Sequence, residues 1–450
     1  MKLLAFLLQT GGHMAGWRHP RAATGALTDI DYFTGLAQVA ERGLFDAVFL
    51  ADYVGYHPVK SADLFAGIES PKLDPALLLA VMGSATTRVG LIGTASTTYN
   101  EPYDLARRMA TLDHVSRGRA GWNIVTSTME NEAHNYGREA HLAHGDRYAR
   151  AAEFVDVVQR LWDCWEDGAV VGDKAAGRYT DPSRIHALAH KGAYFRVAGP
   201  STVPRPPQGH PVLVQAGASD TGKRFAASFA EVVFTSHPTR QSAIAFRSEM
   251  HALLAECGRT PESLKIMTAI TPIIGATHAA AEALQRELDE MIPPAIAISK
   301  LQEYLAGFDL SAFAPDAAFP TLPAEMMQGQ NSTRDRVVAM ARREDLTITQ
   351  VAQRVAAGRT SRTAVGTAAD IADELQDWYT HGAADGFVIS PPFLPGGLDD
   401  FVDQVVPVLQ ARGVFRTRYE GRTLRENLGL ARPANRFDTD PSLRAKPEIW

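Results

Sequence analysis

The chain has 450 residues, of which 45% are hydrophobic and 21% are charged, and its net charge is −6. Such a composition is typical of a globular protein with a large core, in one large domain or two ordinary ones. The acidic balance argues against a nucleic-acid-binding surface and against a basic patch for an anionic membrane, so we expect neither partner. The two cysteines, Cys164 and Cys257, lie far apart and outside any CxxC pair, which favours a reducing cytoplasm.

The first half of the chain alternates short apolar runs with longer helical patterns, which indicates parallel βα units. The run 3–8 is followed by Gln9 and two glycines rather than by a cleavage site, so it predicts a buried strand and not a secretion signal. The next strands are expected at 47–50, 89–94 and 119–125. Helices are expected at about 30–43, 75–86 and 102–115. No apolar segment approaches the length that spans a bilayer.

The second half continues the alternation after a long helix predicted at about 146–165. Strands are expected at 212–215, 232–234, 266–274 and 386–389, and a last helix near 398–412. The total of eight strands is the number that closes a parallel barrel. The predicted fold class is therefore α/β, a (β/α)₈ TIM barrel with insertion segments over its C-terminal face.

Three segments interrupt or follow the alternation. The segment at about 168–209 is rich in Gly, Pro and charge and is expected as an insertion with a strand at 194–197. The segment at about 293–360 lacks a clear strand and is expected as a lid over the barrel mouth. We expect residues 1–418 to form one barrel domain with these insertions. The polar tail, 419–450, is expected as an extension that wraps the barrel or a partner subunit.

The most informative string is GRAGWNIVTS at 118–127, a strand that ends in polar residues. In a (β/α)₈ barrel the carboxyl ends of the strands face the active site. Asn123, Thr126 and Ser127 would then present amide and hydroxyl groups to a ligand. The alternative is that these side chains only cap the following loop.

A turn of small residues, 217–223, follows the strand predicted at 212–215 and opens a helix. Free N–H groups at a helix start favour an anion such as a phosphate. Ala218 is small enough for a phosphate to approach the backbone, and Ser219 offers a hydroxyl donor. A role of Ser219 as an ordinary helix N-cap explains the same pattern.

Five more polar residues stand where strands end or helices begin. His13 follows the first strand, and an imidazole is the type of side chain that commonly transfers protons. Asp52 ends the second strand, where a buried carboxylate needs hydrogen bonds, and Thr94 ends the third. His144 and Tyr148 lie four residues apart at a helix start and lean the same way. Loop capping, solvent exposure or core packing would also account for each of them.

Other active-site signatures are missing from the sequence. The cluster that holds His134, His141 and His144 has no HExxH spacing, so we expect no metal. There is no GxSxG elbow for a Ser-His-Asp triad. No GxGxxG turn indicates a Rossmann NAD site near the N-terminus.

The string 118–127 resembles the signature of the nitrilotriacetate, dibenzothiophene-sulfone and long-chain-alkane monooxygenases, a branch of the bacterial-luciferase-like superfamily. Further segments match that branch in order along nearly the whole chain, and together they are far more specific than one motif. These segments are Gly16–Pro20, Phe45–Asp52, Ser96–Tyr99, Pro102–Tyr103, Ala106–Arg108, Leu112–His114, Gln215–Ser219 and Asp385–Phe387.

The resemblance implies a (β/α)₈ monooxygenase that uses reduced FMN as cofactor and O₂ as co-substrate. Because the chain shows no second nucleotide-binding domain, a separate NAD(P)H:FMN reductase is the expected partner, and family members are often homodimers or homotetramers. His13 is implied as a catalytic residue. Thr128 stands where some relatives carry a second histidine, which puts the substrate type in doubt. The residues expected to bind FMN are Asp52, Thr94, Asn123, His144, Tyr148, Ala218 and Ser219.

Two other functions fit the same residues. One is a deazaflavin-dependent hydride-transfer oxidoreductase on the same barrel, and the other is a non-catalytic flavin-binding protein. The resemblance allows small-molecule substrates of several kinds: organosulfur compounds, aminopolycarboxylates, alkanes or secondary metabolites. An anionic polycarboxylate would favour arginines near the mouth, for which Arg18, Arg184 and Arg205 are candidates.

Overall fold

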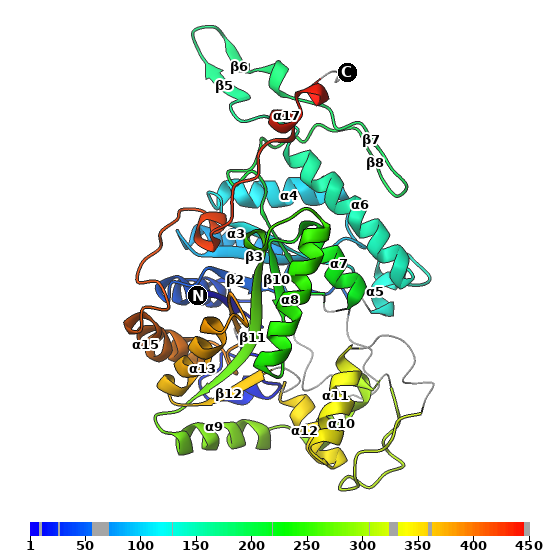
Figure 1. Ribbon diagram of the computed structural model, residues 1–450, viewed down its shortest axis with the longest axis vertical. Coiled ribbons are helices and arrows are strands. Elements are labelled where there is room, and N and C mark those ends of the chain that lie inside the picture. The colour runs from blue at the N-terminus through cyan, green and yellow to red at the C-terminus, as the bar shows by residue number, and fades with distance from the viewer. Residues whose placement is uncertain are drawn as a thin grey trace.

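The structure is a computed structural model that describes residues 1–8, 11–25, 28–55, 72–127, 129–217, 219–305, 307–323, 332–358 and 362–444. Within these residues, eight parallel strands close into a barrel (Figure 1), which confirms the expected fold class. The barrel strands are β1 (Lys2–Phe6), β2 (Ala47–Leu50), β3 (Gly90–Ser96), β4 (Ala120–Val125), β9 (Val212–Gln215), β10 (Val232–Thr235), β11 (Lys265–Ile274) and β13 (Gly386–Ile389).

The barrel closes because each strand pairs with two neighbours. The order runs β1-β2-β3-β4-β9-β10-β11-β13 and returns from β13 to β1. The strands are apolar and almost fully buried, as expected for parallel strands that are covered on both faces. Since all eight run in the same direction, their carboxyl ends meet at one mouth of the barrel.

The covering helices follow the predicted alternation. The first two begin where side-chain caps are available: Asp29 accepts from Asp31 N at α1, and Asp74 accepts from Leu77 N at α3. The helices around the barrel are α1 (Ile30–Arg42), α3 (Pro75–Ser84), α4 (Pro102–Val115), α5 (Glu130–Asn135), α6 (His144–Trp162), α7 (Asp220–Phe229), α8 (Arg240–Glu256), α9 (His278–Glu290), α13 (Ala368–Thr380), α14 (Gly396–Asp400) and α15 (Val406–Ala411), with a π-helical segment, Phe401–Val405, between the last two.

One boundary and one strand differ from the sequence expectation. The long helix α6 ends at Trp162 and not near Trp165, because Trp165 leaves the helix and forms a β-bridge with Ile185. A further strand, β12 (Arg362–Gly366), was not expected. It pairs with the second half of β11, from Ile270 to Ile274, beyond the part of β11 that closes the barrel.

The segment between α9 and β12 contains three helices with a core of their own. These are α10 (Pro294–Tyr304), α11 (Ser332–Arg343) and α12 (Ile348–Ala356). Their buried side chains also pack against Met14 and Ala15, which belong to the loop after β1. Because that loop leaves the carboxyl end of β1, the three helices lie at the mouth of the barrel (Figure 1).

The first inserted segment lies elsewhere. It forms two hairpins, β5 (Val170–Asp173) with β6 (Arg178–Thr180) and β7 (His190–Lys191) with β8 (Arg196–Val197). They project from the body at the end opposite the three inserted helices (Figure 1). This placement follows from topology, because the segment leaves the end of a helix and leads into the start of β9.

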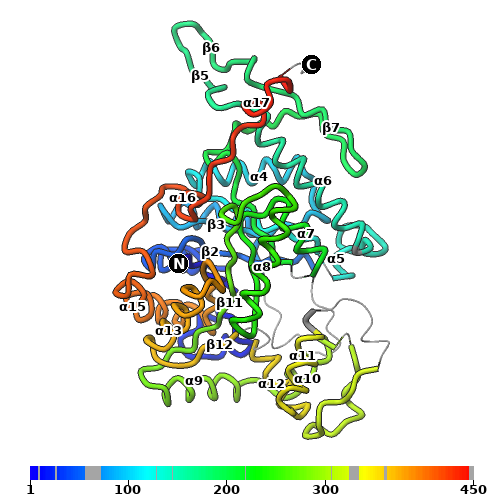
Figure 2. Tube along the Cα trace, viewed as in Figure 1, coloured from blue at the N-terminus to red at the C-terminus, as the bar shows by residue number. Residues whose placement is uncertain are grey.

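The C-terminal tail runs back along the barrel to these hairpins, as Figure 2 shows. On the way, α16 (Leu424–Leu428) places Leu424 and Leu428 among the side chains that fill the barrel interior. A Cβ on Gly90 would lie 2.5 Å from Leu424 Cδ1. The tail therefore closes the N-terminal end of the barrel, and the last helix, α17 (Arg436–Thr439), lies beside the hairpins.

A helix that spans a bilayer must be long and apolar, a requirement that applies to each of the described helices. None of them combines the length and the apolar character that crossing a bilayer needs.

Candidate active site

Two of the expected site residues are joined at the carboxyl ends of β3 and β4. Asn123 Nδ2 donates to Thr94 Oγ1 over 2.8 Å, and Thr94 Oγ1 donates to Leu50 O over 2.9 Å. Both side chains are buried. Asn123 Oδ1 is shielded from water and finds no hydrogen-bond partner among the described residues. A buried acceptor left unsatisfied costs about 1–3 kcal/mol, so this amide is expected to bind a ligand.

Further unsatisfied polar groups lie on and directly after β10 and on β11, on the side of these strands that packs against α8. Thr235 and Thr268 are register partners on these strands, and both hydroxyls are buried without a partner in the described structure. Directly after β10, Ser236 Oγ and His237 Nε2 are also buried without a hydrogen-bond partner in the described structure. Burial, and to a lesser extent the positive charge of Arg336, lowers the pKa of His237 to about 4, so the ring is neutral near pH 7.

The sequence interpretation did not single out these residues. The signal that pointed to Asp52 and Asn123, a polar side chain where a barrel strand ends, was also present at Thr235 to His237. Ser, His and Pro in succession are, however, equally typical of an ordinary loop.

A second pair of expected residues meets at the start of α7. Ser219 is the N-cap, and its Oγ accepts from Gly222 N over 3.1 Å. A Cβ added to Gly222 would lie 3.1 Å from Ser219 Oγ and 3.2 Å from Tyr148 Oη. Tyr148 is held in place by an edge-to-face contact with Phe225, with ring centroids 5.3 Å apart. A helix start with two hydroxyls and a missing side chain is suited to a phosphate group.

These two pairs are brought together by strand order. β4 lies between β3 and β9 in the barrel, so Thr94 on β3, Asn123 on β4 and the turn that follows β9 belong to three neighbouring strands. An elongated ligand with a phosphate at one end would reach from the start of α7 to the ends of β3 and β4.

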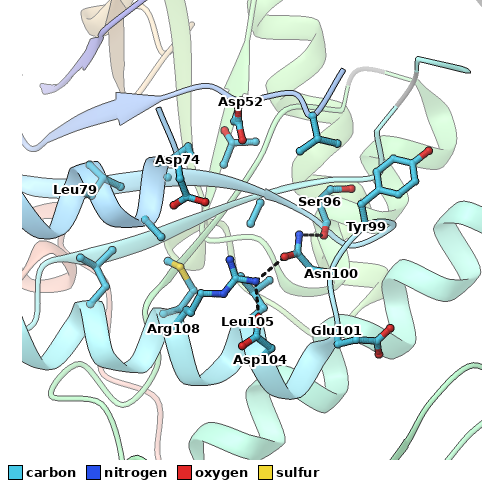
Figure 3. A pocket seen from close by; sticks show the side chains of 18 of the residues that line it. Asp52, Asp74, Leu79, Ser96, Tyr99, Asn100, Glu101, Asp104, Leu105 and Arg108 are labelled. Atoms are coloured by element: carbon cyan, nitrogen blue, oxygen red, sulfur yellow. Dashed lines mark hydrogen bonds and ion pairs between the residues drawn. The ribbon is translucent and has the colours of Figure 1, made fainter. Parts of the chain in front are cut away.

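Asp52 lines a cavity of about 510 Å³ together with Thr94 (Figure 3). Across this cavity, Arg108 donates to Asn100 Oδ1 over 2.7 Å and to Asp104 Oδ2 over 2.6 Å. Burial raises the pKa of Asp52 to about 6, and the positive charge of Lys72 opposes this shift. Asp52 is thus a carboxyl whose ionised form is disfavoured by its surroundings.

This carboxyl predicts a pH dependence of stability in the flavin-free protein. Since the folded state binds the Asp52 proton more tightly than the unfolded state, stability falls as pH rises from about 4 to about 6 and stays lowered above that. Replacing Asp52 by Asn should therefore raise the melting temperature, and its advantage over wild type should grow between about pH 5 and about pH 7.5. Asp316→Asn, in an exposed loop, is the control. An advantage that does not change with pH would contradict this account.

His13 is buried, and both of its ring nitrogens have partners. Nδ1 accepts from Ala15 N over 3.1 Å, and Nε2 lies 3.3 Å from Asp289 Oδ1 at the end of α9. A tautomer with the proton on Nε2 satisfies both contacts. This geometry ties the loop after β1 to α9, and the catalytic role of His13 stays a prediction.

The remaining candidates are placed as follows. The side chain of His144 and the whole of Ala218 lie outside the described residues, although α6 begins at His144. Ser127 adopts a positive φ of 56°, and its Oγ lies 2.8 Å from Ser96 Oγ. Within the described ranges, no three His, Cys, Asp or Glu side chains gather as metal ligands.

The three arginines proposed for an anionic substrate are not alike. Arg205 is buried and forms ion pairs with Asp163 and Asp167, near the tail. Arg184 belongs to the first inserted segment, where it donates to Asp167 O. Arg18, in the loop after β1, lies at the mouth and donates to Met291 O. The first two are therefore far from the strand carboxyl ends.

The fold and the site are those of a (β/α)₈ enzyme whose barrel mouth is suited to a phosphate-bearing ligand. Residues 9–385 match the family model described as luciferase-like monooxygenase. The chain is 46% identical to N-acetyl-S-(2-succino)cysteine monooxygenase of Bacillus subtilis (strain 168), over 97% of this chain and 98% of that protein. It is also 46% identical to nitrilotriacetate monooxygenase component A of Aminobacter aminovorans, over 96% and 97%.

A solved structure agrees with these relatives. The EDTA monooxygenase from Chelativorans sp. BNC1 superposes with a TM-score of 0.78 at 37% identity, covering 97% of this chain and 99% of that one. The chain belongs to the luciferase-like monooxygenase family. The expected branch and the expected class, a two-component flavin-dependent monooxygenase, are therefore confirmed over the hydride-transfer and non-catalytic alternatives.

Proposed function

We propose that this chain is the oxygenating component of a two-component system that uses reduced FMN and O₂. A separate NAD(P)H:FMN reductase would supply the reduced flavin. The observation that carries the proposal is the pairing of the α7 cradle, formed by Ser219, Gly222 and Tyr148 after β9, with the unsatisfied amide of Asn123 on the neighbouring strand β4. The first suits a phosphate and the second suits a polar heterocycle.

The residues that would hold FMN divide into two groups. Ser219 and Tyr148, with Ala218 and His144, would bind the phosphate. Asp52, Thr94 and Asn123 would lie beside the ring, and His13 would stand near the reacting atoms. FMN supplies the activation of O₂, while the protein binds the cofactor, orients the substrate and keeps water out.

The three inserted helices are suited to the last of these tasks. We propose that residues 293–360 form a lid on a single barrel domain, residues 1–418, and that residues 419–450 form an extension. The lid core continues into the loop after β1 through Met14 and Ala15, so the lid is anchored beside His13. A covered mouth would protect the activated oxygen from water.

The names of the relatives suggest the substrate class. Both proteins at 46% identity, and the EDTA monooxygenase, are named for small molecules that carry several carboxylates. We propose that this enzyme also oxidises a small carboxylate-bearing molecule. We further propose a cytoplasmic location. We also propose a homodimer or homotetramer, and light scattering of the purified protein would test this oligomeric state.

Two measurements test the proposal: the binding of FMN, and the coupling of oxygen consumption to product formation. FMN should bind, which quenching of the protein's tryptophan fluorescence would report. With an added NAD(P)H:FMN reductase, the protein should consume oxygen and form product from nitrilotriacetate or N-acetyl-S-(2-succino)cysteine. Lack of FMN binding in both redox states would refute it. Binding without any coupled product from a wider substrate panel would also count against it.

A further inference from the structure

Three phenylalanine rings from different strands meet in the interior of the barrel. Phe6 ends β1, Phe49 lies on β2 and Phe234 lies on β10. The ring centroids of Phe6 and Phe49 are 4.9 Å apart, and that of Phe234 lies 5.8 Å from the first and 5.9 Å from the second. Since β11 and β13 separate β10 from β1, Phe234 reaches the other two rings from a distant part of the wall. These three residues therefore form one aromatic layer in the barrel.

The aromatic layer faces the same interior as the polar residues of the site. Phe49 belongs to the cluster that fills the barrel, and Phe6 and Phe234 pack against that cluster. Alternate side chains of a strand point to opposite faces. Thr94 therefore also points inward, because it lies two residues after Ile92, a member of the same cluster. The rings and the polar side chains at the ends of β3 and β4 thus share one space.

The aromatic layer is covered on one side only. Phe49 is 2% exposed, whereas Phe6 and Phe234 are partly buried. Leu424 and Leu428 fill the interior at the N-terminal end, so the uncovered surface of Phe6 and Phe234 opens toward the mouth. Contact of this apolar surface with water is unfavourable, and a flat apolar ligand would remove it.

The chemistry of the cofactor and of the substrate decides which of them fits this surface. A carboxylate placed on phenylalanine rings would lose its hydration without gaining a hydrogen bond. The tricyclic ring of a flavin is flat and aromatic, and aromatic rings pack on one another with centroids about 4.5–7 Å apart. The surface also adjoins the proposed flavin contacts, because β2, which carries Phe49, pairs with β3, which carries Thr94.

We propose that Phe6 and Phe234 form an apolar floor for the tricyclic ring of FMN, and that Phe234 is a cofactor-binding residue which sets how deeply the ring lies in the mouth. This inference rests on the proposed function, because it takes FMN to be the cofactor. The floor keeps water from the face of the ring that is turned toward the barrel. It leaves the unsatisfied amide of Asn123 to bind the polar edge of the ring.

The test compares the affinities of oxidised FMN and of riboflavin for the same variant. Phe234→Ala removes one ring of the floor and should weaken the binding of both flavins equally, by about tenfold, since both carry the tricyclic ring. A contact to the phosphate would instead affect FMN alone. Phe234→Leu keeps an apolar side chain without an aromatic face and should recover only part of the affinity. Fluorescence titration with each flavin measures these affinities.

Phe437→Ala is the control for the loss of a buried aromatic ring. Phe437 is 6% exposed and packs against His186 of the first inserted segment, away from the mouth. This variant should be less stable in urea but should bind both flavins as wild type does. Phe234→Leu, which keeps the interior filled, carries the comparison with wild type should Phe234→Ala fail to fold.

The titrations also separate the inference from the proposed function. If wild type bound both flavins and the folded Phe234 variants bound them equally well, the inference would be wrong. A loss of affinity confined to FMN would also overturn it, because the lost contact would then be to the phosphate. If wild type bound neither flavin, the proposed function itself would be refuted, and the inference with it.

Discussion

Replacing Tyr148 by Phe should weaken FMN binding by about 10- to 100-fold, because a hydrogen bond to a charged group is worth about 1.5–3 kcal/mol. The phenol oxygen lies at the start of α7, close to the position that a Cβ on Gly222 would take. Ser219→Ala should act in the same direction and also remove the helix N-cap, which costs about 1 kcal/mol of stability. Fluorescence titration with oxidised FMN measures both effects.

Riboflavin is the matched ligand for this experiment, because it lacks only the phosphate. Its affinity should change less than about twofold in Tyr148→Phe, since the lost hydrogen bond is to the phosphate. Tyr179→Phe, on the exposed hairpin strand β6, is the matched variant and should bind FMN as wild type does. If riboflavin and FMN lost affinity equally, Tyr148 would contact another part of the flavin.

Removing the Arg425 side chain should be the most destabilising single change outside the site. Arg425 is 2% exposed and donates to His210 O over 3.0 Å, to Ala431 O over 3.0 Å and to both carboxylate oxygens of Glu231. Arg425→Met would leave Glu231 partly buried without its cation, which typically costs about 3–5 kcal/mol. Urea denaturation should show a correspondingly lower free energy of unfolding.

The control is Arg422→Met, because Arg422 is exposed and three residues away in sequence. The double variant Arg425→Met with Glu231→Met should recover much of the stability, since it removes both charges together. If Arg425→Met were as stable as Arg422→Met, the tail would not hold the N-terminal end of the barrel as described.

The two ends of the barrel are occupied differently, and this explains why the site is at one end only. The N-terminal end of the barrel is filled by Leu424 and Leu428 from the tail. The C-terminal end instead holds polar side chains that face inward, such as Thr94 and Asn123, and Asn123 Oδ1 is shielded without a partner in the described structure. A barrel closed at one end by its own chain leaves the opposite mouth for ligands.

The alternation of apolar runs and helical patterns was enough to predict the barrel, because burial on both faces makes each strand a short continuous apolar segment. The same local logic located Asp52, Thr94, Asn123 and Ser219, since a polar residue that ends a barrel strand lies at the mouth whatever the packing is. A strand such as β12 escaped prediction, because its pairing with β11 depends on residues about 90 positions apart.

Only the tertiary structure decided which polar groups were satisfied. Local sequence does not show that Arg184 and Arg205 bind acidic and backbone groups away from the mouth, or that both nitrogens of His13 have partners. Nor does it show that His237 packs against Phe246 on α8, with Nε2 shielded from water and without a partner in the described structure. Hydrogen bonding and charge pairing depend on distances between distant segments, and those distances are set only when the barrel closes and the inserted helices pack against it.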